Sequence, residues 1–510
     1  MIGVRLRDAL AALWALVLAM PVPPAQAADT ERGRALYEGR VAMSTVGASP
    51  MPAACAACHR PSGMGNFEGG LAVPPIAGPM LFEPLDRDTA RFFPASARWR
   101  VRPAYDEASL GRLLRSGESP DGVTLQPAMP RYRIDDADLA DLSAYLRTMS
   151  QGTPPGLDAD TVRVATVTTP DADPRRRDAM LATLQHFIAQ KNGQSRHEVK
   201  RSVQSSRTRE MVMYRKFRIW QLEHWALQGE PSTWAAQLDA RQSRQPVYAL
   251  VAGMGGAQWA PVDAFCARHR LPCLLPLAEA GGGRAPGFYS LHFHAGIDAD
   301  AAMAASRLKA LGLRRALLWG TPGPLADRVR GVFAGQGVAL DDGDSEAPAI
   351  VSLLPPAAHA ARLREGGHGF RVVAWLPGTH ALGRAELDAS LPQTQRGWIV
   401  TPMRTGEPLD RQLQRTRLWL RGQGLESIPV DVAASTLQAA TVLGEGLVHL
   451  DFGFTPEYLL ELLEHGLENV IPWSPFPRLA IGPDQRIASK GSWVGEVREG
   501  RVAWQWQALP

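Results

Sequence analysis

The residues with the clearest chemical meaning are two cysteines and a histidine near the start of the chain. They form the segment Cys55-Ala56-Ala57-Cys58-His59, in which two residues separate the thiols and an imidazole follows directly. This C-x-x-C-H spacing suits covalent attachment of one haem, because the two thiols can add across the two vinyl groups of a porphyrin while the histidine ligates the iron. A redox dithiol, half of a zinc site and a chance match are the alternatives. The adjacent histidine argues against them.

A low-spin electron carrier needs a second axial ligand, and Met129 is our candidate. It lies in the segment QPAMPRY, where Pro127 and Pro130 stiffen the loop around it. A soft, neutral thioether favours ferrous iron and raises the reduction potential. Met80 is the competing candidate, whereas Met64 is too close to the attachment segment to reach the opposite haem face. With both axial positions filled, we expect electron transfer and no catalysis at the iron.

Two helices are expected to position these ligands. One begins within Arg32 to Tyr37, before the cysteines. The other follows the methionine, with a capping-box-like start at Asp135 and Asp138. Its apolar face consists of Leu139, Leu142, Tyr145 and Leu146.

Together these features make residues 28–150 resemble the class I cytochrome c family. The resemblance implies an all-α domain with one haem c, in which the first and last helices cross near the haem edge. It also implies that a proline carbonyl orients the proximal histidine. The matching position in VPPIAG is Pro74 or Pro75, and we expect Pro75.

The first residues have the pattern of an export signal. Arg5 and Arg7 precede the apolar run Ala9 to Met20, and Ala25-Gln26-Ala27 gives a small-x-small cleavage site. We therefore predict a signal peptide over residues 1–27, a mature chain that starts near Ala28, and a periplasmic location; an uncleaved anchor is the alternative. No later segment is apolar and long enough to cross a membrane. A net charge of only +4 gives no reason to expect a nucleic-acid partner.

The remainder of the chain alternates apolar runs with amphipathic stretches, which is typical of parallel strands joined by helices. The segment 151–160 (QGTPPGLDAD) is predicted to be a linker. Residues 161–510 then contain strand candidates at Val162 to Thr168, Val247 to Val251, Cys273 to Leu275, Arg315 to Trp319, Ala349 to Leu354, Arg371 to Leu376 and Trp398 to Thr401. Late helices are expected at Leu437 to Leu450 and Pro456 to Glu464, before a terminal β segment at Trp493 to Trp506.

This second region resembles the type I periplasmic binding proteins. The resemblance rests on the order of segments such as VRVATVTT, PVYALVAGMGG and VDVAASTLQAATVLGEGL. It implies a two-lobed α/β fold with a small-molecule ligand held between the lobes, at the carboxyl ends of strands. The matching cleft residues are Thr168, Thr169, Gly255, Gly256, Ala257, Ala278 and Glu279.

The composition of these loops puts an amino-acid ligand in doubt. In amino-acid binders two of the loops supply hydroxyl groups and backbone amides to the ligand carboxylate. Here Gly255, Gly256 and Ala257 occupy one loop and residues 278–280 the other, so the hydroxyl groups are missing and backbone amides are left to hold an anion. The alternative is a binding fold kept as a docking scaffold.

Cys266 and Cys273 are either a disulfide or two buried free thiols. An exported chain allows the disulfide to persist, and the helix-to-strand turn between the two residues could bring their Cα atoms close enough.

The sequence thus predicts a periplasmic mono-haem cytochrome, not an enzyme, that carries single electrons. Its binding-protein-like domain either recruits a redox partner protein or binds a small molecule. The alternatives are a sensor that couples ligand binding to the haem, and an electron-accepting subunit of a periplasmic dehydrogenase.

Overall fold

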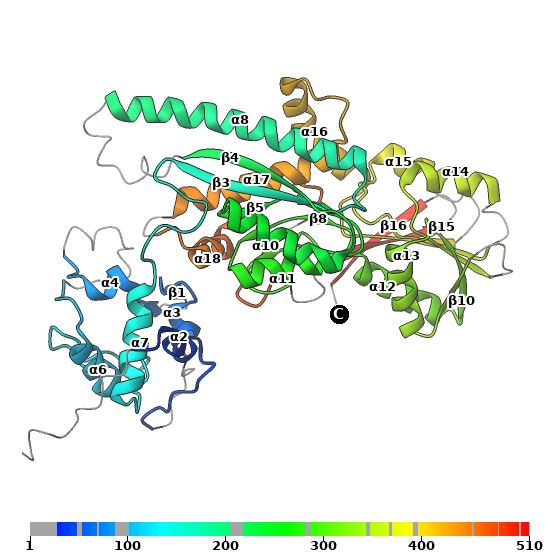
Figure 1. Ribbon diagram of the computed structural model, residues 1–510. Helices are drawn as coiled ribbons and strands as arrows, with labels where there is room; N and C mark the ends of the chain where they lie inside the picture. The colour runs from blue at the N-terminus through cyan, green and yellow to red at the C-terminus, as the bar shows by residue number, and fades with distance from the viewer. Residues whose placement is uncertain are drawn as a thin grey trace, which may run out of the picture. The chain divides into compact units, whose positions relative to one another are not determined.

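The chain forms two compact units, which divide after Gln151. Figure 1 shows the computed structural model. It describes residues 28–47, 54–68, 71–86, 101–204, 218–280, 286–342, 347–366, 370–390, 396–450, 453–477, 479–498 and 501–508. The predicted signal peptide lies outside the described residues. No helix within the described ranges is long and apolar enough to span a bilayer.

Helices dominate the first unit and enclose a small hydrophobic core. They are α2 (Thr30–Glu38), α3 (Cys55–His59), α4 (Gly78–Phe82), α6 (Glu107–Ser116) and α7 (Asp136–Thr148). The Asp135 side chain caps α7 by accepting from the backbone N–H of Asp138. Three residues of the predicted apolar face of α7 are buried, namely Leu139, Leu142 and Leu146.

The first and last helices of this unit touch backbone to backbone. A Cβ atom built on Gly33 of α2 would lie 2.0 Å from the carbonyl oxygen of Asp141 in α7. Around this contact, Arg32 pairs with Asp138 at 2.6 Å and the ring centroids of Tyr37 and Tyr145 are 5.5 Å apart. Glycine is therefore required at position 33 for the helices to cross this closely.

The prediction of an all-α first unit is incomplete, because the unit also contains a short antiparallel pair. Strands β1 (Asn66–Glu68) and β2 (Leu71–Val73) pair in the register Asn66↔Val73. Their sequences are too short to show a period, which explains why the alternation of residues did not reveal them.

The predicted linker is shorter than the sequence suggests. From Gly156 onward it packs on the second unit, where Leu157 is buried and the backbone N–H of Arg163 donates to the carbonyl of Gly156 at 2.8 Å. Arg163 also pairs with Asp158 at 2.8 Å. The apolar side chain of Leu157 favours burial over a free linker.

The second unit is an α/β structure with two lobes, each built on a seven-stranded sheet. The lobe whose strands lie within residues 161–291 is called lobe 1, and the lobe whose strands lie within residues 315–508 is called lobe 2. In lobe 1 the strands are all parallel, and β3 lies between β4 and the broken strand β5–β6. Its strands are β3 (Thr161–Thr168), β4 (Ile219–Ala226), β5 (Ala249–Val251), β6 (Met254–Gly255), β7 (Cys273–Leu274), β8 (Leu277–Ala278) and β9 (Ser290–Leu291).

Helices cover both faces of the lobe 1 sheet, as a buried parallel sheet requires. Val162 and Val164 of β3 face the core with α8 (Pro174–Gln204), α17 (Val430–His449) and α18 (Pro456–Gly466). Ala165 and Val167 face the opposite core, with α10 (Trp234–Arg244) and α11 (Ala260–His269). Figure 1 shows α8 running along this sheet.

The sheet of lobe 2 has five parallel strands followed by an antiparallel hairpin. Its order is β11-β10-β12-β13-β14-β15-β16. The strands are β10 (Arg315–Trp319), β11 (Ala339–Asp341), β12 (Ala349–Ser352), β13 (Val372–Trp375), β14 (Arg396–Thr401), β15 (Gly491–Arg498) and β16 (Arg501–Ala508). The surrounding helices are α12 (Ile297–Ala310), α13 (Pro324–Gly335), α14 (Pro356–Gly366) and α15 (Arg384–Ala389), whereas α16 (Gly406–Gln423) packs on α17 and α8.

The chain passes between the lobes three times. It enters lobe 2 at α12 and returns after β14, because Val432 and Leu443 of α17 lie in the core of lobe 1. It then crosses again to form β15 beside β14. These sheets and crossings confirm the prediction of a two-lobed α/β region.

We predict that Gly33→Ala lowers the free energy of unfolding of the first unit by about 1–3 kcal/mol, because the added methyl group forces α2 away from α7. Thermal unfolding followed at the absorbance of the attached haem measures this. Gly331→Ala is the control, since a Cβ at this position in α13 has no atom within 4 Å. A Gly33→Ala protein that melts with the wild type contradicts the helix contact.

Candidate functional site

The helix α3 places Cys55, Cys58 and His59 on one turn. Cys55 and His59 are buried and Cys58 is half-buried. The His59 Nδ1 atom lies 2.8 Å from the carbonyl oxygen of Pro74. Our expectation of Pro75 is therefore wrong by one residue: the Pro74 side chain is exposed, but its carbonyl points at the imidazole, while Pro75 is itself buried.

This hydrogen bond decides which nitrogen of His59 can ligate a metal. A carbonyl oxygen only accepts, so Nδ1 carries the proton and donates it. Burial lowers the pKa of His59 to about 4, against the opposing effect of the Pro74 hydrogen bond. The ring is consequently neutral at physiological pH, and Nε2 keeps the lone pair that an iron ligand needs.

Two glycines let the chain bring Pro74 back to His59. The backbone N–H of Gly65 donates to the carbonyl of His59 at 3.0 Å, and the N–H of Ile76 donates to the carbonyl of Gly63 at 2.7 Å. Both glycines have positive φ, 73° at Gly63 and 74° at Gly65. A Cβ at Gly65 would lie 2.1 Å from the Val73 carbonyl oxygen, so no other residue fits this return.

The loop that carries Met129 is held in shape by Arg131. Its guanidinium donates to the carbonyls of Met129 and Leu125, the latter at 2.7 Å. Next to it, the backbone N–H of Tyr132 donates to the carbonyl of Leu114 at 2.7 Å. These bonds fix the backbone around the methionine.

Packing distinguishes the candidate methionines. The core cluster that contains Cys55 and Tyr132 is contacted by Met129 and also by Met64. Met80 is not among the residues packed against this cluster in the described part of the chain; its carbonyl instead accepts from the guanidinium of Arg102. The packing therefore favours Met129 over Met80.

The electrostatics of this region link the Met129 loop to the cysteines. Burial raises the pKa of Cys55 to about 12, and burial also raises the pKa of Cys58. Tyr132 shares a hydrophobic cluster with Cys55, and its pKa is raised by burial and by both cysteines. Two thiols, a neutral imidazole and a fixed methionine loop form a donor set that fits a covalently bound haem.

The predicted ligand cleft of the second unit is occupied by the chain's own carboxylate. Asp171 accepts from the backbone N–H of Gly256 at 3.1 Å and of Ala257 at 3.0 Å, and Thr169 donates its hydroxyl to the same side chain at 2.5 Å. A Cβ at Gly256 would lie 2.3 Å from an Asp171 carboxylate oxygen. The amides expected to hold an anion do so, but the anion is internal.

The second predicted cleft loop is also engaged. Glu279 accepts from the backbone N–H of Thr379 at 3.1 Å and from the hydroxyl of the same residue. Because Glu279 follows β8 in lobe 1 and Thr379 follows β13 in lobe 2, this contact joins the lobes. Thr168 is bonded to His224 at 2.9 Å, and Ala278 is packed in a lobe 1 core.

An arginine of the basic cluster 175–177, which the sequence indicates to be a solvated surface, completes the link between the lobes. Arg176 of α8 pairs with Asp431 at 2.9 Å and donates to the Thr379 carbonyl at 2.8 Å. Burial raises the pKa of Asp431, but the charge of Arg176 and its hydrogen bond outweigh this and leave the pKa below its usual value. Sequence reasoning missed the roles of Asp171, Arg176 and Asp431 because no motif marks residues whose partners lie 85 to 255 positions away.

Cys266 and Cys273 form a disulfide with a Cα–Cα distance of 6.3 Å. It joins α11 to β7 within the core that covers one face of lobe 1. The bond belongs to the scaffold of lobe 1 and lies outside the haem-binding residues.

Comparison with known proteins agrees with the two-unit organisation. Residues 31–150 match the family model described as Cytochrome c, so the first unit is a cytochrome c domain. Domains of this family carry haem and transfer electrons. No curated protein was found to match the chain.

Three of the solved structures that are similar to the chain are described as binding proteins or as a ligand-binding receptor. One, described as a possible leucine/isoleucine/valine-binding protein from Rhodopirellula baltica SH 1, is 13% identical with a TM-score of 0.45, over 69% of this chain and 97% of that one. A leucine binding protein from Thermotoga maritima MSB8 is 14% identical with a TM-score of 0.42, over 68% and 99%. An extracellular ligand-binding receptor from Rhodopseudomonas palustris HaA2 is 12% identical with a TM-score of 0.43, over 68% and 100%.

We predict that Asp171→Ala lowers the free energy of unfolding of the second unit by about 1–3 kcal/mol, because the amides of Gly256 and Ala257 lose their hydrogen bonds to a charged group. Acetate should then restore part of the loss in the variant and leave the wild type unchanged. Urea unfolding followed by tryptophan fluorescence reports mainly on this unit, which holds most of the tryptophans.

The control is Asp388→Ala, which removes an exposed partner of Arg384 and should change stability by less than about 1 kcal/mol. Equal effects of the two substitutions are inconsistent with an occupied amide site.

Proposed function

We propose that this chain is a periplasmic mono-haem cytochrome that accepts and passes on single electrons. The observation that carries the proposal is the hydrogen bond from His59 Nδ1 to the Pro74 carbonyl, directly after Cys58 in a cytochrome c domain. Cys55 and Cys58 would hold the haem covalently, and His59 and Met129 would ligate its iron. The bound haem supplies a one-electron couple.

The protein's own residues tune and protect that couple. Burial of His59 among apolar side chains excludes water from the ligand, and the Pro74 carbonyl makes its Nε2 a stronger donor. Arg131 holds the loop of Met129 in place, which lowers the reorganisation that a change of charge would cause. A methionine ligand favours the reduced state, so we propose a relatively high reduction potential.

For the second unit we propose recruitment of a redox partner protein, with a periplasmic dehydrogenase as the candidate class. The support is the predicted cleft, in which Asp171 and Glu279 already occupy the polar groups. A free amino acid would have to displace Asp171 from the amides of Gly256 and Ala257. Export by the signal sequence over residues 1–27 belongs to the same proposal.

Covalent attachment is tested by replacing the two cysteines. Cys55→Ala together with Cys58→Ala should abolish haem staining of the denatured protein on a gel, because no thioether remains. The matched control is Cys266→Ala together with Cys273→Ala, which should retain the stain. Haem staining in the Cys55/Cys58 variant would rule out the proposal.

The sixth ligand is tested by spectroscopy. The oxidised protein should show the weak charge-transfer band of methionine sulfur bound to ferric iron, and Met129→Ala should remove this band and lower the potential. Met80→Ala serves as the control and should leave both unchanged. If the band survives in Met129→Ala and disappears in Met80→Ala, the ligand is Met80 and our assignment of Met129 is wrong.

A further inference from the structure

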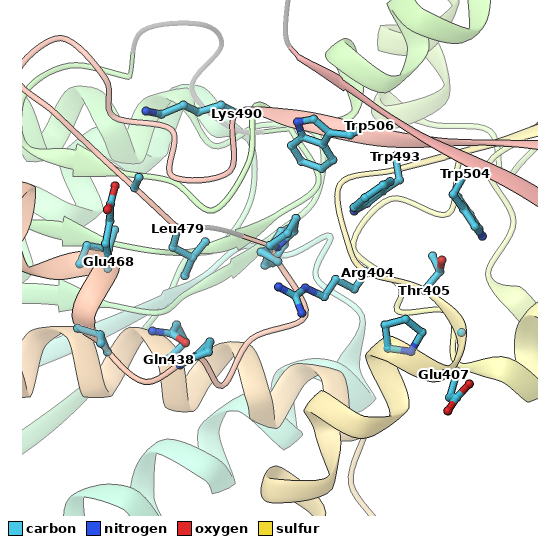
Figure 2. A pocket seen from close by; sticks show the side chains of 18 residues that line it. Arg404, Thr405, Glu407, Gln438, Glu468, Leu479, Lys490, Trp493, Trp504 and Trp506 are labelled. Carbon is cyan, nitrogen blue, oxygen red and sulfur yellow. The ribbon is translucent and has the colours of Figure 1, made fainter.

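A large pocket lies in the second unit, away from the predicted cleft. Its volume is about 1320 Å³, and none of the predicted cleft residues lines it. Residues of both lobes line it. They include Arg404, Gln438, Leu479, Trp493, Trp504 and Trp506 (Figure 2).

The tryptophans come from the terminal hairpin and offer flat apolar surfaces. Trp493 of β15 pairs across the hairpin with Trp506 of β16, and their rings meet edge to face with centroids 5.2 Å apart. Trp504 lies over Gly495, where a Cβ would come within 2.7 Å of the indole ring. All three indoles are only partly buried, so ring surface remains for a planar ligand to stack on.

The opposite wall is held in place before any ligand arrives. Phe476 stacks on Phe293 with centroids 4.7 Å apart and an interplanar angle of 8°. The carbonyl of Pro475 accepts from the backbone N–H of Arg404 at 2.9 Å, and the Gln438 carboxamide oxygen accepts from the N–H of Trp473 at 2.6 Å. A preformed wall reduces the ordering cost of binding.

Arg404 and Lys490 are the basic residues that line the pocket, and Glu407 and Glu468 are the acidic ones. Figure 2 shows its side chain at the centre of the view, between the tryptophans and Gln438. Among the described residues, no carboxylate forms an ion pair with its guanidinium. Glu407, the nearest acidic lining residue in sequence, is paired with Arg411 at 2.5 Å. The Gln438 oxygen is engaged, which leaves its amide N–H groups as further donors.

We propose that this pocket binds a small aromatic carboxylate, whose rings stack on the tryptophans while its carboxylate is held by Arg404. A guanidinium and a carboxylate form two parallel hydrogen bonds, and such charge-assisted bonds are stronger where water is excluded. The site lies outside the haem-binding residues, so it adds a binding activity to the proposed electron transfer and does not depend on it.

The test is calorimetric titration of the full haem-containing chain with 2-naphthoate. Arg404→Gln should weaken binding by about tenfold or more, since a hydrogen bond to a charged group is lost, and Trp504→Leu should weaken it as well. Arg384→Gln, which alters an exposed arginine of α15, should bind as the wild type does. Neutral 2-naphthol and acetate should both bind more weakly than 2-naphthoate.

The proposal is overturned if 2-naphthoate fails to bind at millimolar concentration, or if the Arg404 and Trp504 variants bind it as well as the wild type while they melt normally. Equal binding of 2-naphthol overturns the role of Arg404. Binding of a decaproline peptide in place of 2-naphthoate would assign the pocket to a protein partner.

Discussion

The hydrogen bond between His59 and the Pro74 carbonyl is the interaction on which the chemistry of the first unit depends. It fixes the proton on Nδ1, and burial keeps the ring neutral by lowering the pKa of His59 to about 4. A protonated imidazole would carry hydrogen on both nitrogens and could not ligate iron. The chain turns back at Gly63 and Gly65 and brings Pro74 to this position. The backbone of this segment therefore positions the hydrogen-bond acceptor of the His59 side chain.

In the second unit, hydrogen bonds and ion pairs made by buried or partly buried charged side chains fix the region between the lobes. Asp171 satisfies the amides that would otherwise attract a ligand carboxylate, and Glu279 and Arg176 join the lobes through Thr379. An external anion must compete with Asp171 for the amides of Gly256 and Ala257. Because Asp171 belongs to the same chain, its effective concentration at these amides is high. The cleft is therefore poorly suited to weak ligands, and the lobes are already held together without one.

The sequence predicted motifs and strands that lie within a few consecutive residues, but not contacts between residues that are far apart in the chain. The spacing of Cys55, Cys58 and His59 is contained in five residues, and the strand β10 was predicted with the bounds that the structure gives it. The choice between Pro74 and Pro75 depended on which carbonyl turns inward, which no residue type encodes. Strand β4 escaped notice because apolar and polar residues do not alternate regularly in its sequence, IWQLEHWA. Asp171 fills its site through residues about 85 positions away, a relation that only the fold creates.

The two anion-binding features of the second unit differ in one physical respect. The amides of Gly256 and Ala257 face an internal carboxylate, whereas the guanidinium of Arg404 has no such partner among the described residues. A ligand carboxylate can bind Arg404 without breaking an ion pair within the protein. Its binding free energy is therefore not reduced by the cost of displacing an internal carboxylate. The pocket is also built from both lobes, which Glu279 and Arg176 link in advance. A ligand there would meet a preformed surface, which lowers the ordering cost of binding.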